Sequence, residues 1–187
     1  MKKSSMILLG VVAVIILLVA MLGGSYNSLV SKEEKVDQRY ADISVQLERR
    51  ADLIPNLVNT VKGYAAHETE IINSITTARE NLLNANSVEE KSEANAELTS
   101  AIDALMVIVE NYPDLKANQN FIQLSDELAG TENRIATSRR DYNEAVTSYN
   151  TAIKKFPTNI LASMFGFGEK DYFEVSEGKT EVPEVEF

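Results

Sequence analysis

A run of seam positions spaced alternately four and three residues apart extends from Val36 to Leu82. This spacing averages 3.5 residues and keeps one stripe of an α-helix facing a partner helix. A continuous helix of this length would measure roughly 70 Å. A small globular core cannot bury such a stripe, so other long helices must lie beside it. The stripe consists of Val36, Tyr40, Ile43, Leu47, Arg50, Ile54, Leu57, Val61, Tyr64, Glu68, Ile71, Ile75, Ala78 and Leu82.

Pro55 lies in the middle of this stretch. An interior proline removes one helical hydrogen bond and costs about 3 kcal/mol. The helix therefore either kinks and continues, or breaks at Pro55 and yields a fourth bundle helix. Because the stripe keeps its phase on both sides of the proline, we expect a kink. Gly63 is a second weak point.

Two more long helices are predicted downstream. Ser87 and Glu90 have the spacing of a capping box, which begins a helix that ends near Asn111. A loop is expected over residues 113–120. The next helix is expected over residues 121–156, because its apolar positions repeat the alternating spacing of the first stripe.

A short, very apolar helix is predicted after Pro157, over residues 160–165. We expect its Ile160, Met164 and Phe165 to close the end of the bundle, and contact with a membrane surface is the alternative. Residues 169–187 hold seven acidic residues and two lysines. Such a segment is expected to be a flexible tail.

Residues 6–22 form an apolar run of about the length that a helix needs to cross a bilayer. A cleaved signal peptide is the alternative, because Lys2 and Lys3 resemble its basic region. The run is long for a signal peptide and lacks a small-residue cleavage site, which favours an uncleaved anchor. The basic N-terminus favours an orientation with the bundle outside the cytoplasm.

Composition excludes several classes of function. The formal net charge of −10 disfavours binding to nucleic acid. The absence of cysteine excludes thiol catalysis and cysteine-ligated metals. His67 is the single histidine, and the His67-Glu68 pair lacks the second histidine of an HExxH zinc motif. We predict no catalytic residue, no metal site and no cofactor.

Two charged residues, Arg50 and Glu68, interrupt the first stripe. A buried charge is costly unless it is paired, so each is expected to meet a polar group on a facing helix. Such pairs are best known for fixing the register of helices. We expect the polar seam of the bundle to consist of Arg50, Glu68, Glu132, Arg139, Tyr142 and Tyr149.

Eight segments after the apolar run carry a specific pattern: Tyr26–Val30, Leu47–Val58, Val61–Glu68, Tyr112–Ala117, Asn120–Phe121, Glu132–Ala136, Tyr142–Asn150 and Phe156–Pro157. With these segments the chain resembles the bacterial LemA family, and the match spans nearly all of the chain after the apolar run. One departure is Tyr40, where the family usually has tryptophan. The resemblance implies a membrane-anchored helical bundle and supplies no enzymatic reaction.

The sequence thus predicts an all-α protein in which a transmembrane helix precedes an elongated antiparallel bundle. The bundle has three long helices, or four if the first breaks at Pro55, and a short C-terminal helix. The expected segments are a basic N-terminus (1–5), a membrane helix (6–24), a bundle (25–168) and a tail (169–187).

The expected function is that of a scaffold or protein-interaction module in the bacterial cell membrane, with no catalytic activity. Its expected partners are the bilayer and an unidentified protein, with a homo-oligomer as a further option and without a small-molecule substrate. The alternative function is action on the bilayer itself, in membrane remodelling or envelope stress, with residues 160–167 touching lipid.

Overall fold

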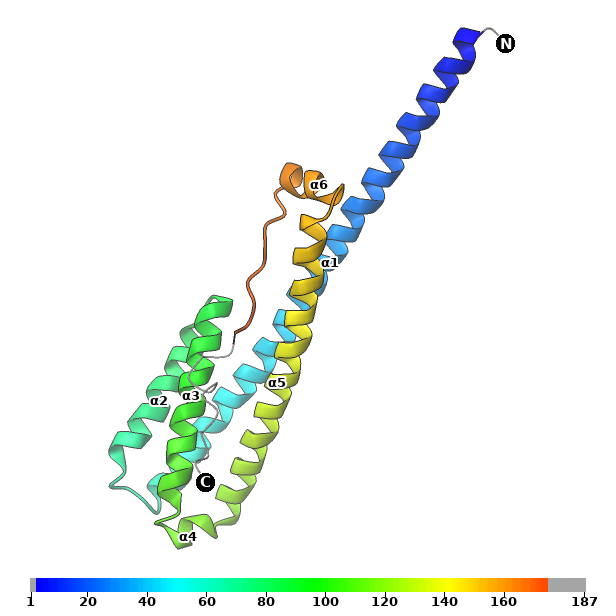
Figure 1. The fold of residues 1–187 in the computed structure, drawn as a ribbon. Coiled ribbons are helices and arrows are strands. Elements are labelled where there is room, and N and C mark those ends of the chain that lie inside the picture. Colours follow the sequence, from blue (N-terminus) through cyan, green and yellow to red (C-terminus); the bar gives the residue numbers. More distant parts are fainter. Residues whose placement is uncertain (1–2, 175–187) are drawn as a thin grey trace, which may run out of the picture. The chain divides into compact units, whose positions relative to one another are not determined.

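The computed structural model describes residues 3–174, with side-chain environments from residue 9 onward except at 14 and 18. These residues form helices and no strand, which confirms the all-α prediction. The expected tail lies outside them from residue 175 onward. Figure 1 labels the helices α1 (Lys3–Lys62), α2 (Thr69–Asn84), α3 (Val88–Val109), α4 (Pro113–Lys116), α5 (Gln119–Lys154) and α6 (Thr158–Phe165).

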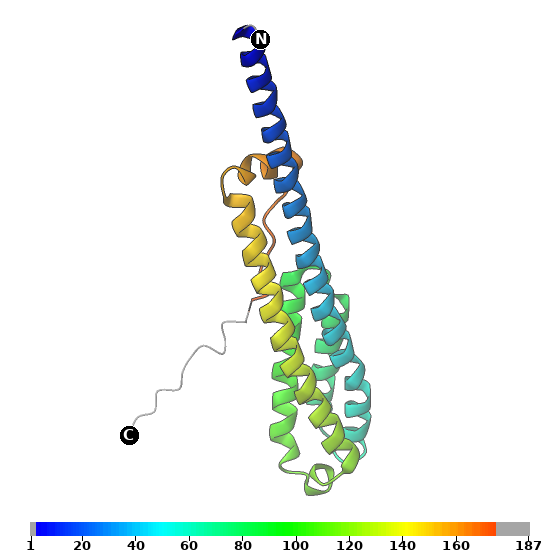
Figure 2. The ribbon, with the colours of Figure 1, turned by 90° about the vertical axis from the view of Figure 1, so that its right-hand side faces the viewer.

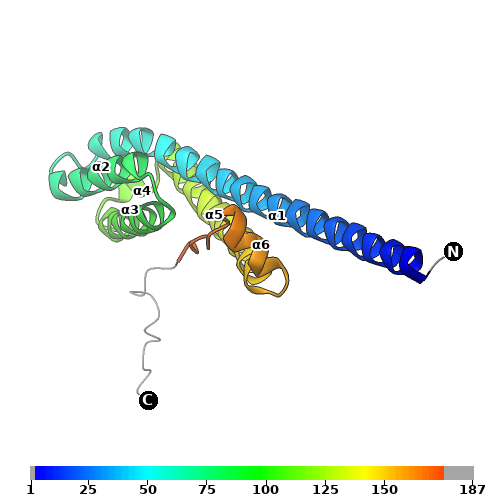
Figure 3. The same cartoon turned by 90° about the horizontal axis from the view of Figure 1, so that it is seen from above.

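The described residues divide into two compact units. The first unit contains residues 3–39 and 143–170, and the second contains residues 40–142 and 171–174. In the second unit the end of α1, then α2, α3 and the start of α5 alternate in direction, and α2 lies beside α3 (Figures 1 and 3). This is the helical bundle that the apolar stripes predicted.

The core of the second unit contains the expected stripe of α1, whose Ile43, Ile54, Leu57 and Val61 are at most 1% exposed. The core also contains residues of α5, where Phe121, Leu128, Thr131, Ile135 and Tyr142 are likewise buried. Burial of these side chains is the main favourable term in holding the helices together.

The prediction of one helix from Val36 to Leu82 is wrong, because α1 ends at Lys62 and α2 begins at Thr69. The amide groups of Gly63 and Tyr64 bond carbonyls only three residues back, which tightens and ends the helix. Tyr64, an expected stripe member, is 46% exposed, and Ala65 is buried instead.

The stripe concealed this break because its phase continues in the next helix. Ile75, Ala78 and Leu82 of α2 are buried as expected, although they face the core from a separate helix. A turn whose length fits the spacing of the apolar stripe therefore cannot be recognised from that spacing.

Pro55 lies inside α1, which continues through it as expected. Because proline has no amide hydrogen, the carbonyl of Ala51, four residues earlier, lacks its helical donor. Ala51 is fully buried, so water cannot replace that donor. The Nε of Arg79 on α2 donates to the Ala51 oxygen at 2.8 Å. The neighbouring helix thus satisfies the carbonyl that the proline leaves unpaired.

The capping box at the start of α3 is confirmed. The amide of Glu90 donates to Ser87 Oγ at 3.0 Å, and the amide of Ser87 donates to Glu90 Oε2 at 3.2 Å. The loop expected over 113–120 instead contains the one-turn helix α4. Pro113 stands at its start, where a missing amide hydrogen costs nothing, and Leu115 is fully buried.

In the first unit, α1 runs beside the C-terminal half of α5 (Figure 2). Lys32 Nζ donates to Ser148 Oγ at 2.7 Å between the two helices. The buried side chains include Leu29 and Val36 of α1 and Val146 and Tyr149 of α5. The helix expected to reach residue 156 ends at Lys154, and Phe156 is 81% exposed.

The Pro55–Arg79 relation predicts a coupled pair of substitutions. In the native chain, Arg79→Met leaves a buried carbonyl without a donor and should lower the free energy of unfolding by about 1–3 kcal/mol. In a Pro55→Ala background the restored amide of residue 55 donates to the Ala51 carbonyl. Arg79→Met should then lower the free energy of unfolding by less than half as much as in the native chain. Urea unfolding of the full chain in detergent, followed by far-UV circular dichroism, measures both costs. Equal costs in the two backgrounds would contradict the assignment.

Candidate functional site

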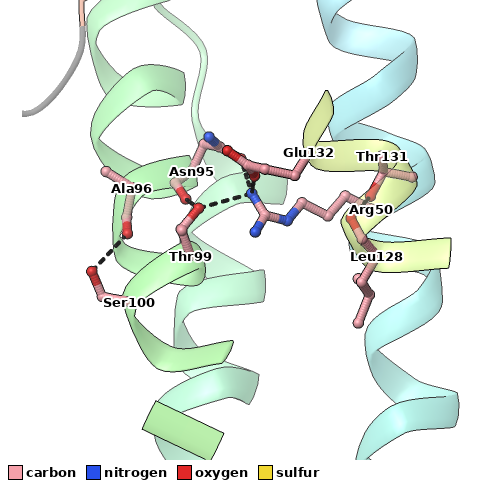
Figure 4. A network of polar contacts seen from close by, with 8 residues as sticks. All are labelled: Arg50, Asn95, Ala96, Thr99, Ser100, Leu128, Thr131 and Glu132. Carbon is pink, nitrogen blue, oxygen red and sulfur yellow. Dashed lines mark hydrogen bonds and ion pairs between the residues drawn. The ribbon is translucent and has the colours of Figure 1, made fainter. Parts of the chain in front are cut away.

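The polar seam of the second unit is centred on Arg50, whose side chain is 3% exposed (Figure 4). Its Nη1 lies 2.6 Å from Glu132 Oε2 on α5. The same nitrogen donates to Asn95 Oδ1 at 2.7 Å and to Thr99 Oγ1 at 2.9 Å, both on α3. One guanidinium therefore joins three helices.

Burying the charge of Arg50 costs free energy, and its hydrogen-bond and ion-pair partners offset that cost. Burial lowers the pKa of Arg50, and the nearby carboxylate of Glu132 opposes that shift. Its Nε has no hydrogen-bond partner among residues 3–174. The side chain of Glu132 is 44% exposed, so the buried charge is paired with a group that reaches water. Because arginine remains protonated, this arrangement suits register and not proton transfer.

Glu68 bonds to a different residue and is not part of the Arg50 network. Its Oε1 accepts a hydrogen bond from the Tyr112 hydroxyl at 2.6 Å. That bond raises the pKa of Tyr112. The contact joins the residue before α2 to the residue before α4, so it ties together two loops of the bundle.

The two seam tyrosines of α5 have different partners. The hydroxyl of Tyr142 donates to the Asp171 carbonyl at 2.8 Å, and its ring lies 6.0 Å from that of Tyr40. Tyr149 is fully buried in the first unit, and its hydroxyl has no hydrogen-bond partner among the described residues. Burial, followed by the charge of Glu33, raises the pKa of Tyr149.

Arg139 is half-buried. Within residues 3–174 it makes no hydrogen bond or ion pair with another side chain. The structure thus brings Arg50 together with Glu132 and places the other four seam residues in separate environments.

The chain after α6 is extended and bonded to helices in both units. In the first unit, the side-chain amide of Asn150 donates to the Lys170 carbonyl at 2.9 Å and accepts from the Lys170 amide at 3.0 Å. In the second unit, Ser92 Oγ donates to the Glu174 carbonyl, and Phe173 is 1% exposed. Residues 169–174, where the expected tail begins, are therefore packed.

The short helix α6 does not close the bundle as predicted. Its Ile160, Met164 and Phe165 are 53%, 69% and 56% exposed, while Leu161 and Ala162 are buried. The prediction placed the wrong face inward, because a helix of two turns that is apolar on all sides gives no periodic signal.

Among the described residues, no group of three or more histidine, cysteine, aspartate or glutamate side chains is placed to hold a metal ion. His67 is exposed in the turn between α1 and α2. A shallow depression of about 480 Å³ is lined by Arg49 and Glu127, whose ion pair is exposed to solvent.

Comparison with known proteins identifies the family. The model of the LemA family matches residues 39–187. The chain belongs to the LemA family. It is 30% identical to Protein LemA of Metamycoplasma hominis over 158 residues, which cover 82% of this chain and 71% of that protein.

Other relatives carry a different name. The chain is 28% identical to Magnetosome protein MamQ 2 of Paramagnetospirillum magneticum over 186 residues, covering 86% of this chain and 68% of that protein. It is 26% identical to Magnetosome protein MamQ of Magnetospirillum gryphiswaldense, over 79% of this chain and 64% of that protein. In this LemA-family chain, one described helix, α1, is long and apolar enough to cross a membrane.

Sequence reasoning missed three kinds of polar contact in this LemA-family bundle. Pro55 could have pointed to a donor for the Ala51 carbonyl, although not to Arg79 in particular. Asn95 and Thr99 lie four residues apart on one face of α3, which is a weak signal for a shared partner. Asn150 gave no signal, because its partner is the backbone of a distant segment.

The seam predicts unequal roles for two glutamates of α5 that have similar exposure. Glu132→Leu removes the charge that faces buried Arg50 and should lower the free energy of unfolding by about 2–3 kcal/mol. Glu127→Leu removes only an exposed pair with Arg49 and should cost less than about 0.5 kcal/mol. Urea unfolding of the full chain in detergent compares them. Similar costs would show that Arg50 does not depend on Glu132.

The packed segment after α6 makes a second prediction. Phe173→Ala empties a buried site and should lower the free energy of unfolding by about 2–4 kcal/mol. The neighbouring Tyr172 is 42% exposed, so Tyr172→Ala should cost less than about 1 kcal/mol. Thermal unfolding of both variants provides the test, and an unchanged Phe173→Ala midpoint would count against a structural role for this segment.

Proposed function

We propose that this LemA-family chain is a single-pass scaffold of the bacterial cell membrane that presents a helical bundle to a protein partner and has no catalytic activity. The observation that carries the proposal is the continuity of α1, Lys3–Lys62. The described side chains of its apolar part are exposed, and its later part supplies core residues of the second unit. No linker separates the membrane segment from the bundle helix.

The polar seam supports this role. Arg50 binds groups on α3 and α5 from its position on α1, so a shift of any one helix by a turn would leave a buried charge unpaired. We propose that this network fixes the register of the bundle and thereby the shape of its surface.

The second unit offers exposed apolar side chains for a partner. Val45 of α1 is 59% exposed and Val107 of α3 is 71% exposed. We propose that such positions contact an unidentified protein or a second copy of the chain. The basic N-terminus supports an orientation with the bundle outside the cytoplasm.

A second candidate function is action on the bilayer itself, with residues 160–167 touching lipid. The observation in its favour is the exposure of three apolar side chains on α6. A membrane-acting protein changes the curvature or size of the membrane that it binds, whereas a scaffold leaves both unchanged.

Two measurements on the full chain separate these functions. In cell membranes, a photo-crosslinking residue that replaces Val45 or Val107 should form discrete crosslinked adducts with another protein chain. The same residue in place of Ala136, which is also exposed, should form none. Vesicles reconstituted with the purified chain should keep their diameter in electron micrographs. Narrowed or tubular vesicles would favour the second candidate. The absence of adducts at both valines would count against the scaffold.

A further inference from the structure

Apolar side chains of α6 and of the residue before its turn give the first unit an exposed apolar surface. It comprises Phe156, Ile160, Met164 and Phe165, which are between 53% and 81% exposed. Leu161 and Ala162 of the same helix are buried and anchor it. Side chains of this kind are rarely left together in water, so a partner is expected to cover them.

The location of this surface within the first unit indicates the partner. The ring of Tyr26 on α1 lies 4.9 Å from the ring of Phe165 and 5.7 Å from that of Phe167. Tyr26 follows Leu22, the last residue of the apolar run, by four positions, or about 6 Å along the helix. The headgroup region of a bilayer is about 5–8 Å thick on each side. If α1 crosses the bilayer, α6 therefore lies at the level of the headgroups.

The charges around α6 also suit a membrane surface. Residues 154–168 contain two lysines and no acidic residue, in a chain whose net charge is −10. Lys154 pairs with Glu169, and Lys155 is exposed. A short apolar helix that carries basic residues at its edge is typical of segments that lie in the interface of an anionic bilayer. Tyrosine is also common at this depth.

We propose that α6 is a membrane-surface helix whose exposed apolar side chains enter the boundary between headgroups and acyl chains of the bilayer that α1 crosses. The first unit then contacts one bilayer at two places, through α1 and through α6. This inference rests on the membrane anchoring in the proposed function and concerns the lipid contact of its second candidate. It requires no change in membrane shape.

The absence of cysteine in the chain allows a single probe to be placed at will. Met164→Cys and Val107→Cys, which lie at positions 69% and 71% exposed, each carry one environment-sensitive fluorophore in the full chain. The labelled chains are reconstituted in vesicles of phosphatidylcholine and phosphatidylglycerol. Lipids with a spin label near the headgroup should quench the probe at position 164 at least about fivefold more than the probe at position 107.

Equal quenching at the two positions would overturn the proposal. The probe at position 164 could instead show a blue-shifted emission that grows with protein density and is not quenched. That result would show that a second copy covers α6, and it would also overturn the proposal. A further variant adds Ile160→Ser to Met164→Cys and should roughly halve the quenching while far-UV circular dichroism stays unchanged.

The diameter of the same vesicles distinguishes this inference from the functions proposed above. Quenching at position 164 with unchanged vesicles supports the surface helix and argues against bilayer remodelling. Quenching at position 164 together with narrowed vesicles supports both the surface helix and bilayer remodelling. Loss of the Val45 and Val107 adducts bears on the scaffold alone, because those residues lie in the second unit.

Discussion

The continuity of α1 is the constraint on which the rest of the structure depends. A helix satisfies its own backbone hydrogen bonds, so one helix can extend from lipid into a bundle without exposing unpaired groups. Its side chains meet different surroundings along its length. Between Leu9 and Leu22 the described side chains are exposed, and from Leu29 onward one stripe is buried. The other long helices are needed to cover that stripe.

We propose that buried polar groups give the bundle its specificity. The apolar stripes of α1, α2, α3 and α5 could pack in more than one register, because leucine, isoleucine and valine contacts are not directional. The guanidinium of Arg50 and the free carbonyl of Ala51 are directional, and each needs a partner from another helix. Each contact therefore depends on how the helices that make it are aligned.

Sequence reasoning succeeded where the signal was long or local. The stripes of α1 and α5 were read from many repeats, and the Ser87–Glu90 capping box involves only neighbouring residues. It failed at the turn after Lys62, because the apolar repeat continues across it. It also failed at α6, where two turns of apolar sequence do not distinguish a buried face from an exposed one.

The sequence alone determined the helical class, the apolar anchor and the need to pair Arg50, because periodicity, hydropathy and the cost of a buried charge are properties of the chain itself. Only the tertiary structure decided that Asn95, Thr99 and Glu132 meet Arg50, that Arg79 serves Ala51, and that Phe173 is buried. Those outcomes depend on which distant segments become neighbours. Spacing along one helix carries no information about the side chains that face it.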